Sequence, residues 1–139
     1  MQFASTNSAY DAANVFLFAT DNTNVEWTLK GGFRNKKITY ILGTNNSENS
    51  VTSLYGLTKS KDALFPDFKA IFDIHSHPYD QFASPEDINS FTLFPNVKHS
   101  LYFVDERTLF KYTDKENSIK SIKVNSMDDL MKYIFQQLK

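Results

Sequence analysis

The chain has no cysteine and only four glycines, four prolines and one tryptophan among its 139 residues. Without cysteine there is no disulfide bond, no thiolate metal site and no cysteine nucleophile. The formal net charge of -1 provides no basic field for nucleic acid or an anionic membrane, so neither is an expected partner. No apolar run is long enough to span a bilayer, and residues 1–7 do not resemble a signal peptide. The location is left open between the cytoplasm and delivery as part of a larger secreted protein.

Hydrophobic and aromatic residues are plentiful. They make up 41% and 15% of the chain, with thirteen phenylalanines and seven tyrosines. A chain of this length and composition is not disordered and is long enough to bury a core. We therefore expect one domain that spans residues 1–139.

Helical and strand patterns alternate along the chain without internal repeats. Apolar residues at helical spacing, with capping residues before them, predict helices from Thr6 or Asn7 to 21, over 84–94 and over 126–138. Strand patterns are found at 25–29, 37–42, 51–57, 68–77, 100–104, 108–112 and 118–124. In this interpretation Gly31 and Gly32 close the first strand, 43–50 is a loop, and 118–124 is an edge strand. The order of elements favours an α/β fold with one mixed sheet sandwiched by helices.

Two of the three histidines lie in one short segment, Asp73-Ile74-His75-Ser76-His77-Pro78. Side chains alternate between the two faces of a strand, so His75 and His77 must point to the same side. Two imidazoles arranged in this way can bind a single metal ion.

A carboxylate follows at a predicted helix start, Ser84-Pro85-Glu86-Asp87. Ser84 is a good N-cap, Pro85 suits the first helical position, and acidic residues are favoured in the first turn. Asp87 can thus supply a third ligand. Two histidines and one carboxylate, with a position left for water, are typical of a catalytic zinc site.

His-x-His-Pro followed by Ser-x-x-Asp resembles the JAMM signature of the JAB/MPN-domain metalloproteases, and a compact bacterial toxin or effector-type member is suspected. The resemblance implies a JAB/MPN-like fold with the layered architecture of cytidine deaminases. It also implies one zinc ion per chain, held by His75, His77 and Asp87. Glu26, on a strand after the first helix, would act on the metal-bound water. Ser84 would hydrogen-bond the developing oxyanion.

The spacing differs from the family pattern by one residue. Six residues separate His77 from Ser84, where seven are usual. The shorter loop makes Asp80 a rival to Asp87 as the third ligand.

The activity that the resemblance implies is zinc-dependent hydrolysis of an amide or isopeptide bond in a protein or peptide, with a ubiquitin-like tail as one option. Glu26 would serve first as general base and then as general acid. One alternative is a JAB-like toxin or effector domain from a larger secreted bacterial protein, and another is an inactive MPN-like scaffold that binds partners. Asp-x-His-x-His also opens the barrels of some other metallohydrolases, but those motifs lie on the first strand of a longer chain. The oligomeric state stays open.

Two further residues, Asp73 and His99, are considered for a role at this site. Asp73 points to the same side as His75 and His77, and we weigh a supporting role behind the ligands equally against a surface position. His99 is expected to end a loop rather than to bind metal.

Overall fold

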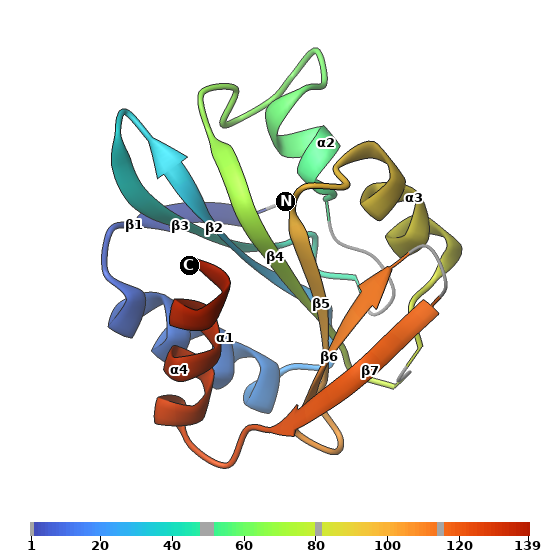
Figure 1. Ribbon diagram of the computed structural model, residues 1–139. Helices are drawn as coiled ribbons and strands as arrows, with labels where there is room; N and C mark the ends of the chain where they lie inside the picture. Colours follow the sequence, from blue (N-terminus) through green and yellow to red (C-terminus); the bar gives the residue numbers. More distant parts are fainter. Residues whose placement is uncertain (1, 48–51, 80–81, 114–115) are drawn as a thin grey trace.

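The computed structural model describes residues 2–47, 52–79, 82–113 and 116–139. Within these ranges the chain forms one seven-stranded sheet with helices on both faces (Figure 1). The strands are β1 (Gln2–Thr6), β2 (Trp27–Arg34), β3 (Lys37–Thr44), β4 (Lys69–His77), β5 (Lys98–Phe103), β6 (Thr108–Thr113) and β7 (Glu116–Lys123). The helices are α1 (Ala9–Asn22), α2 (Leu54–Thr58), α3 (Pro85–Leu93) and α4 (Met127–Gln137).

The sheet is mixed, as the sequence predicts. Its strand order is β1-β3-β2-β4-β5-β6-β7, and only the β4–β5 pair among the described strands is parallel. The predicted edge strand is confirmed as β7, which ends the sheet beside β6. β4 lies in the middle, between β2 and β5, so the histidine segment is placed at the centre of the sheet.

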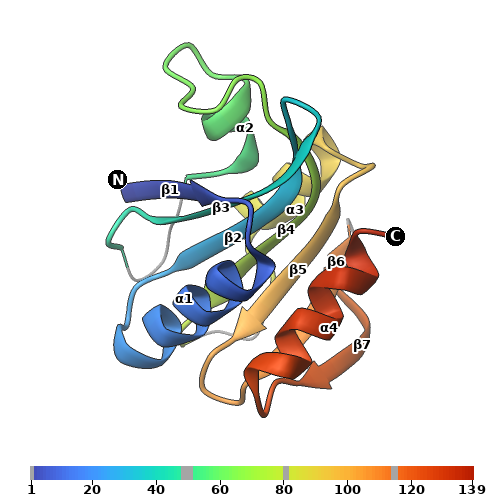
Figure 2. The same cartoon turned by 90° about the vertical axis from the view of Figure 1, so that its left-hand side faces the viewer.

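Helices α1 and α4 cover one face of the sheet, side by side (Figure 2). The buried residues of these helices pack on side chains of the central strands that point to the same face. Phe16 packs on Tyr102, for example, with ring centroids 5.9 Å apart. Leu29 and Ile74, which face each other across β2 and β4, lie in the same cluster. This is the largest apolar cluster among the described residues, and it lies on the face opposite the histidines.

The other face carries α2 and α3 and has two smaller apolar clusters. Leu54 and Leu57 of α2 pack with Ile41 of β3. Partly buried Ile88 and Phe91 of α3 pack on a cluster formed by β5 and β6. The middle of this face, between the two clusters, carries polar side chains.

The three longer helices begin at serine caps. Ser8, rather than the predicted Thr6 or Asn7, accepts a hydrogen bond from the first turn of α1. Ser84 and Ser126 cap α3 and α4, as predicted, and each forms a reciprocal capping box, with Asp87 and Asp129 respectively.

The prediction that Gly31 and Gly32 close the first strand is wrong, because β2 continues through them to Arg34. The pairing of β2 with β4 shifts register between the two glycines, as at a β-bulge. A Cβ on Gly32 would lie 1.9 Å from the carbonyl oxygen of Lys69. The glycines therefore permit close approach of two strands, which is their other common role in a sheet.

Two more predictions fail in this region of the sheet. The expected strand at 51–57 is wrong over its described part, because residues from Leu54 form α2 with Ser53 as its cap. The expected loop at 43–50 begins later, since β3 continues to Thr44, and residues 48–51 lie outside the described part of the chain. Strand β1 was not predicted; it pairs with β3 at the sheet edge.

No helix in the described ranges combines the length and hydrophobicity that crossing a lipid bilayer requires.

Candidate metal centre

His75 and His77 lie at the carboxyl end of β4 and point to the same face of the sheet, as alternation predicts. Their ring centroids are 5.0 Å apart, and both side chains are buried. The face is the one that carries α2 and α3. The strand thus presents two buried imidazoles side by side on this face.

Asp87 reaches the histidines from the first turn of α3. Its Oδ1 lies 2.8 Å from Nε2 of His75, and its Oδ2 lies 3.2 Å from Nε2 of His77. Oδ2 also accepts a hydrogen bond from the backbone N–H of Ser84, at 2.8 Å. The capping box of α3 therefore orients the same carboxylate that faces the two imidazoles.

Glu26 approaches from the opposite side, just before β2. Its Oε1 is 4.0 Å from Nε2 of His77, and the residue is only 7% exposed. Both backbone polar groups of Glu26 are hydrogen-bonded. Its N–H donates to the carbonyl oxygen of Ser47, and its carbonyl oxygen accepts from Thr44 Oγ1, each at 2.7 Å. Ser76 of the histidine motif accepts a hydrogen bond from the N–H of Trp27 at 2.8 Å and so ties the start of β2 to β4.

Glu26, His75 and His77 can together hold a metal ion, because one ligand atom from each lies within 4.8 Å of the other two. Ligands at about 2.0–2.2 Å from a tetrahedral zinc are roughly 3.3 Å from one another, close to the His–Asp87 separations. Nε2 of His75 lies 2.8 Å from Asp87 Oδ1, yet it has no hydrogen-bond partner among the described residues. A close nitrogen–oxygen contact of this kind fits two atoms that share an ion. The residues therefore fit a zinc ion.

The charges of these side chains depend on one another. Burial alone would lower the pKa of His75, but the carboxylates of Asp87 and Asp73 outweigh it and raise that pKa above its ordinary value. Burial would raise the pKa of Asp87, but His75, His77 and the Ser84 N–H hold it well below its usual range. Asp87 is thus an anion at neutral pH, the form in which a carboxylate binds metal.

Ser84 lies beside Asp87, and its hydroxyl oxygen accepts a hydrogen bond from the Asp87 N–H at 3.1 Å. The hydroxyl hydrogen is not used by this cap, since a serine hydroxyl can accept and donate at once. Capping the helix and donating to a substrate are therefore compatible for Ser84.

Asp73 is not a surface residue, so that interpretation is wrong. It is 4% exposed and lies in a buried ion pair with Lys30 of β2, at 2.7 Å from Nζ to Oδ1. Thr28 completes the group, as its hydroxyl accepts from Lys30 at 2.6 Å and lies 3.2 Å from Asp73 Oδ1. Burial would raise the pKa of Asp73, but the positive charges of Lys30, His75 and His99 keep it below its ordinary value.

His99 does not end a loop; it is buried within β5, and that expectation is wrong. One ring nitrogen, Nε2, contacts the carbonyl oxygen of Phe94 at 2.9 Å, and burial lowers the pKa of His99. Its ring lies beside Tyr112 of β6, with centroids 5.5 Å apart. That His99 binds no metal stays a prediction. Asp80, the rival third ligand, lies outside the described residues.

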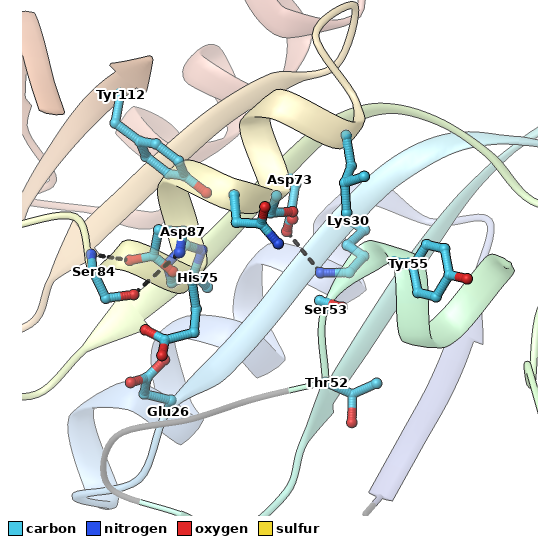
Figure 3. A pocket seen from close by; sticks show the side chains of 14 residues that line it. Glu26, Lys30, Thr52, Ser53, Tyr55, Asp73, His75, Ser84, Asp87 and Tyr112 are labelled. Atoms are coloured by element: carbon cyan, nitrogen blue, oxygen red, sulfur yellow. Dashed lines mark hydrogen bonds and ion pairs between the residues drawn. The ribbon is translucent and has the colours of Figure 1, made fainter. Parts of the chain in front are cut away.

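Glu26, His75 and Asp87 line a cleft of about 720 Å³ (Figure 3). β2 and β4 form its floor with Lys30, Asp73 and His75, and α2 and α3 form its walls. Tyr112 also lines it, from the side of β6. Sequence reasoning missed Lys30 and Tyr112. Lys30 had a weak signal, since it is the one charged residue in the sequence from Trp27 to Phe33, and Tyr112 had none.

The chain matches the family model described as JAB-like toxin 1 over residues 4–93. The searches of curated proteins and of solved structures gave no match. The matched stretch runs from β1 to the last residue of α3 and includes the residues that carry the JAMM-like pattern, Glu26, His75, His77, Ser84 and Asp87. With about two thirds of its length in this match, and with the mixed α/β sheet described above, the chain belongs to the JAB-like toxin 1 family.

Proposed function

We propose that the protein is a zinc-dependent peptidase or isopeptidase that hydrolyses an amide bond in a protein or peptide. The observation that carries this proposal is the convergence of Glu26, His75, His77 and Asp87, from three separate segments, at one end of a cleft. Two imidazoles and two carboxylates around an open space are the donor set of a catalytic metal site rather than of a closed structural one.

In this proposal His75, His77 and Asp87 hold the zinc ion. The bound metal would polarise the scissile carbonyl and bring the pKa of its water to about 7. Because Glu26 Oε1 is 4.0 Å from His77 Nε2, we assign Glu26 to proton transfer rather than to ligation. Its carboxylate would accept the proton of the attacking water and deliver it to the departing nitrogen.

Ser84 would donate its free hydroxyl hydrogen to the carbonyl oxygen as negative charge develops there. Such donors act best when they are fixed beforehand. The Ser84 hydroxyl is fixed by its bond from the Asp87 N–H. The first turn of α3 thus positions both the Ser84 hydroxyl and the Asp87 carboxylate.

The family match favours a toxin or effector role over a housekeeping one. We therefore propose that the domain acts on a protein of another cell, delivered as part of a larger secreted bacterial protein. An inactive binding scaffold is the competing proposal; the acidic side chain of Glu26, buried beside the histidines, argues against it.

The test is metal-dependent cleavage. Zinc-loaded protein would be incubated with amine-blocked peptides from a digested proteome, supplemented with peptides branched through a lysine ε-amine, and new amines would be identified by mass spectrometry. We expect zinc-dependent cleavage that falls about 10²–10⁴-fold in Glu26→Gln, the usual size of a general acid–base contribution. Stoichiometric zinc without any cleavage would favour the scaffold, and an unimpaired Glu26→Gln would remove Glu26 from the mechanism.

A further inference from the structure

Tyr112 lines the same cleft as the candidate ligands, but the mechanism above gives it no task. Its side chain is 2% exposed, and its ring stands edge-on to His75, with centroids 5.7 Å apart. Its hydroxyl has no hydrogen-bond partner among the described residues. Buried hydroxyl groups are nearly always paired, so one left unpaired beside a cleft points to a missing acceptor. Figure 3 shows this hydroxyl directed toward the middle of the cleft.

Lys30 presents a second unused donor from the other side of the cleft. Two of its three N–H groups are taken, by Thr28 Oγ1 at 2.6 Å and by Asp73 Oδ1 at 2.7 Å. The third has no partner among the residues that the structure describes. Since a protonated lysine has three donors and no acceptor, Lys30 can still bind one oxygen atom.

The two donors meet over the same short segment of β4. Lys30 reaches it from β2 at Asp73, and Tyr112 reaches it from β6 at His75. Residues two apart on a strand are about 6.6 Å apart along it. This is also the repeat between alternate residues of an extended peptide, so a peptide that runs along this segment of β4 passes both donors.

The charge of the cleft favours neutral acceptors over anions. Among the described lining residues, Glu26, Asp73, Glu86 and Asp87 carry four negative charges, against one positive charge on Lys30 and two on the proposed zinc ion. A free carboxylate or phosphate would be repelled by this surplus of negative charge. A main-chain carbonyl oxygen accepts hydrogen bonds without carrying a full charge.

We infer that Tyr112 and Lys30 are substrate-binding residues that donate hydrogen bonds to main-chain carbonyl oxygens of an extended peptide lying in the cleft between α2 and α3. The inference rests on the proposed peptidase function and deepens it, because it makes recognition of the backbone, rather than of an acidic side chain, the basis of binding. It also explains why the Tyr112 hydroxyl and one N–H of Lys30 have no partner among the described residues.

The probe is N-acetyl-triglycine amide, a neutral peptide with carbonyl groups and no side chains. It would be titrated into zinc-loaded protein carrying Glu26→Gln, so that the peptide stays intact, and followed by NMR. We expect saturable shifts at residues of the cleft, including the side-chain ammonium signal of Lys30. Adding Tyr112→Phe should weaken binding about 3- to 10-fold, the equivalent of one neutral hydrogen bond.

Tyr102→Phe is the matched control. Tyr102 is fully buried, and its hydroxyl also lacks a partner among the described residues, but it packs on Phe16 on the opposite face of the sheet. Tyr102→Phe should leave the peptide affinity unchanged. The zinc content should be unchanged in both variants.

Absence of saturable binding, an unmoved Lys30 signal, or equal affinity in the Tyr112→Phe and Tyr102→Phe proteins would overturn the inference. The outcome is separable from that of the proposed function. Binding through Tyr112 without cleavage by the unmodified protein would leave the inference standing and remove the peptidase activity. Cleavage with unchanged kcat/KM in Tyr112→Phe would support the peptidase activity and overturn the inference.

Discussion

Oδ1 of Asp87 lies 2.8 Å from Nε2 of His75, a contact that joins the first turn of α3 to the central strand β4. The same aspartate closes the capping box of α3 with Ser84. One side chain therefore serves the helix and the candidate metal centre. Substitutions that keep one of these roles and remove the other can separate them.

Replacing Asp87 should remove metal binding. We expect Asp87→Asn to lower zinc affinity by at least about 10²-fold, since losing even a residue behind the ligands commonly costs about 10–100-fold. Glu86→Gln is the control, because Glu86 is the neighbouring carboxylate but is not in contact with either histidine in the described ion pairs. Native mass spectrometry and competition with a chelator measure both. Equal zinc affinity in the two variants would show that Asp87 is not a ligand.

Ser84 should matter for catalysis beyond its cap. Glycine replaces a serine cap at a cost of only a few tenths of a kcal/mol. Ser84→Gly should therefore keep the fold and the zinc. If the hydroxyl stabilises the oxyanion, cleavage should fall about 10²–10³-fold.

Ser126→Gly supplies the comparison, because Ser126 caps α4 in the same type of capping box and lies outside the cleft. It should change thermal stability by a similar amount and leave the cleavage rate as it is. A parallel loss of activity in both variants would mean that helix stability, not the Ser84 hydroxyl, limits the reaction.

The elements that carry the site could be predicted because their signals are local. Alternation on one strand fixes the shared face of His75 and His77, and Ser84 with Asp87 marks the start of α3. The position of Glu26 relative to them depends on the pairing of β2 with β4 and of β2 with β3. The family resemblance supplied that relation; no local pattern did.

What could not be predicted depends on contacts distant in sequence. Gly31 and Gly32 are turn formers by composition, and only the approach of Lys69 shows why β2 continues through them. Residues 52–57 carry a strand-like pattern, yet Leu54 and Leu57 meet Ile41 as part of a helix. Lys30 has a partner on another strand, so its burial was not visible in its own segment.

The Lys30–Asp73 ion pair should be costly to break from one side. Both side chains are almost fully buried, at 2% and 5% exposure. Removing one partner leaves an uncompensated buried charge, and Lys30→Met should lower the free energy of unfolding by about 3–5 kcal/mol. The double variant Lys30→Met with Asp73→Leu should regain much of that loss.

Urea unfolding of the two single variants and the double variant measures the coupling. For comparison, Arg34→Met breaks an exposed ion pair with Asp67 and should cost far less stability, because exposed pairs are screened by solvent. Additive effects in the Lys30 and Asp73 variants would show that the two charges do not stabilise each other.

Removing the metal should loosen α3 without unfolding the protein. The main apolar cluster lies under α1 and α4, on the face opposite the histidines, and does not involve the candidate ligands. α3 has no fully buried residue and touches the sheet through the Asp87 contacts and the partly buried Ile88 and Phe91. Without zinc, fewer charge interactions hold the first turn of α3 to β4.

Circular dichroism after chelation should retain the helix and strand signal, because a catalytic metal contributes less to folding than a structural one. Hydrogen exchange should quicken at the backbone amides of α3, such as those of Ile88 and Phe94, whose partners lie within the helix or its cap. The amides of β4, paired on both sides by β2 and β5, should stay protected. An unfolded spectrum after chelation would instead make the zinc structural, and unchanged exchange in α3 would mean that its packing, not the metal, holds it in place.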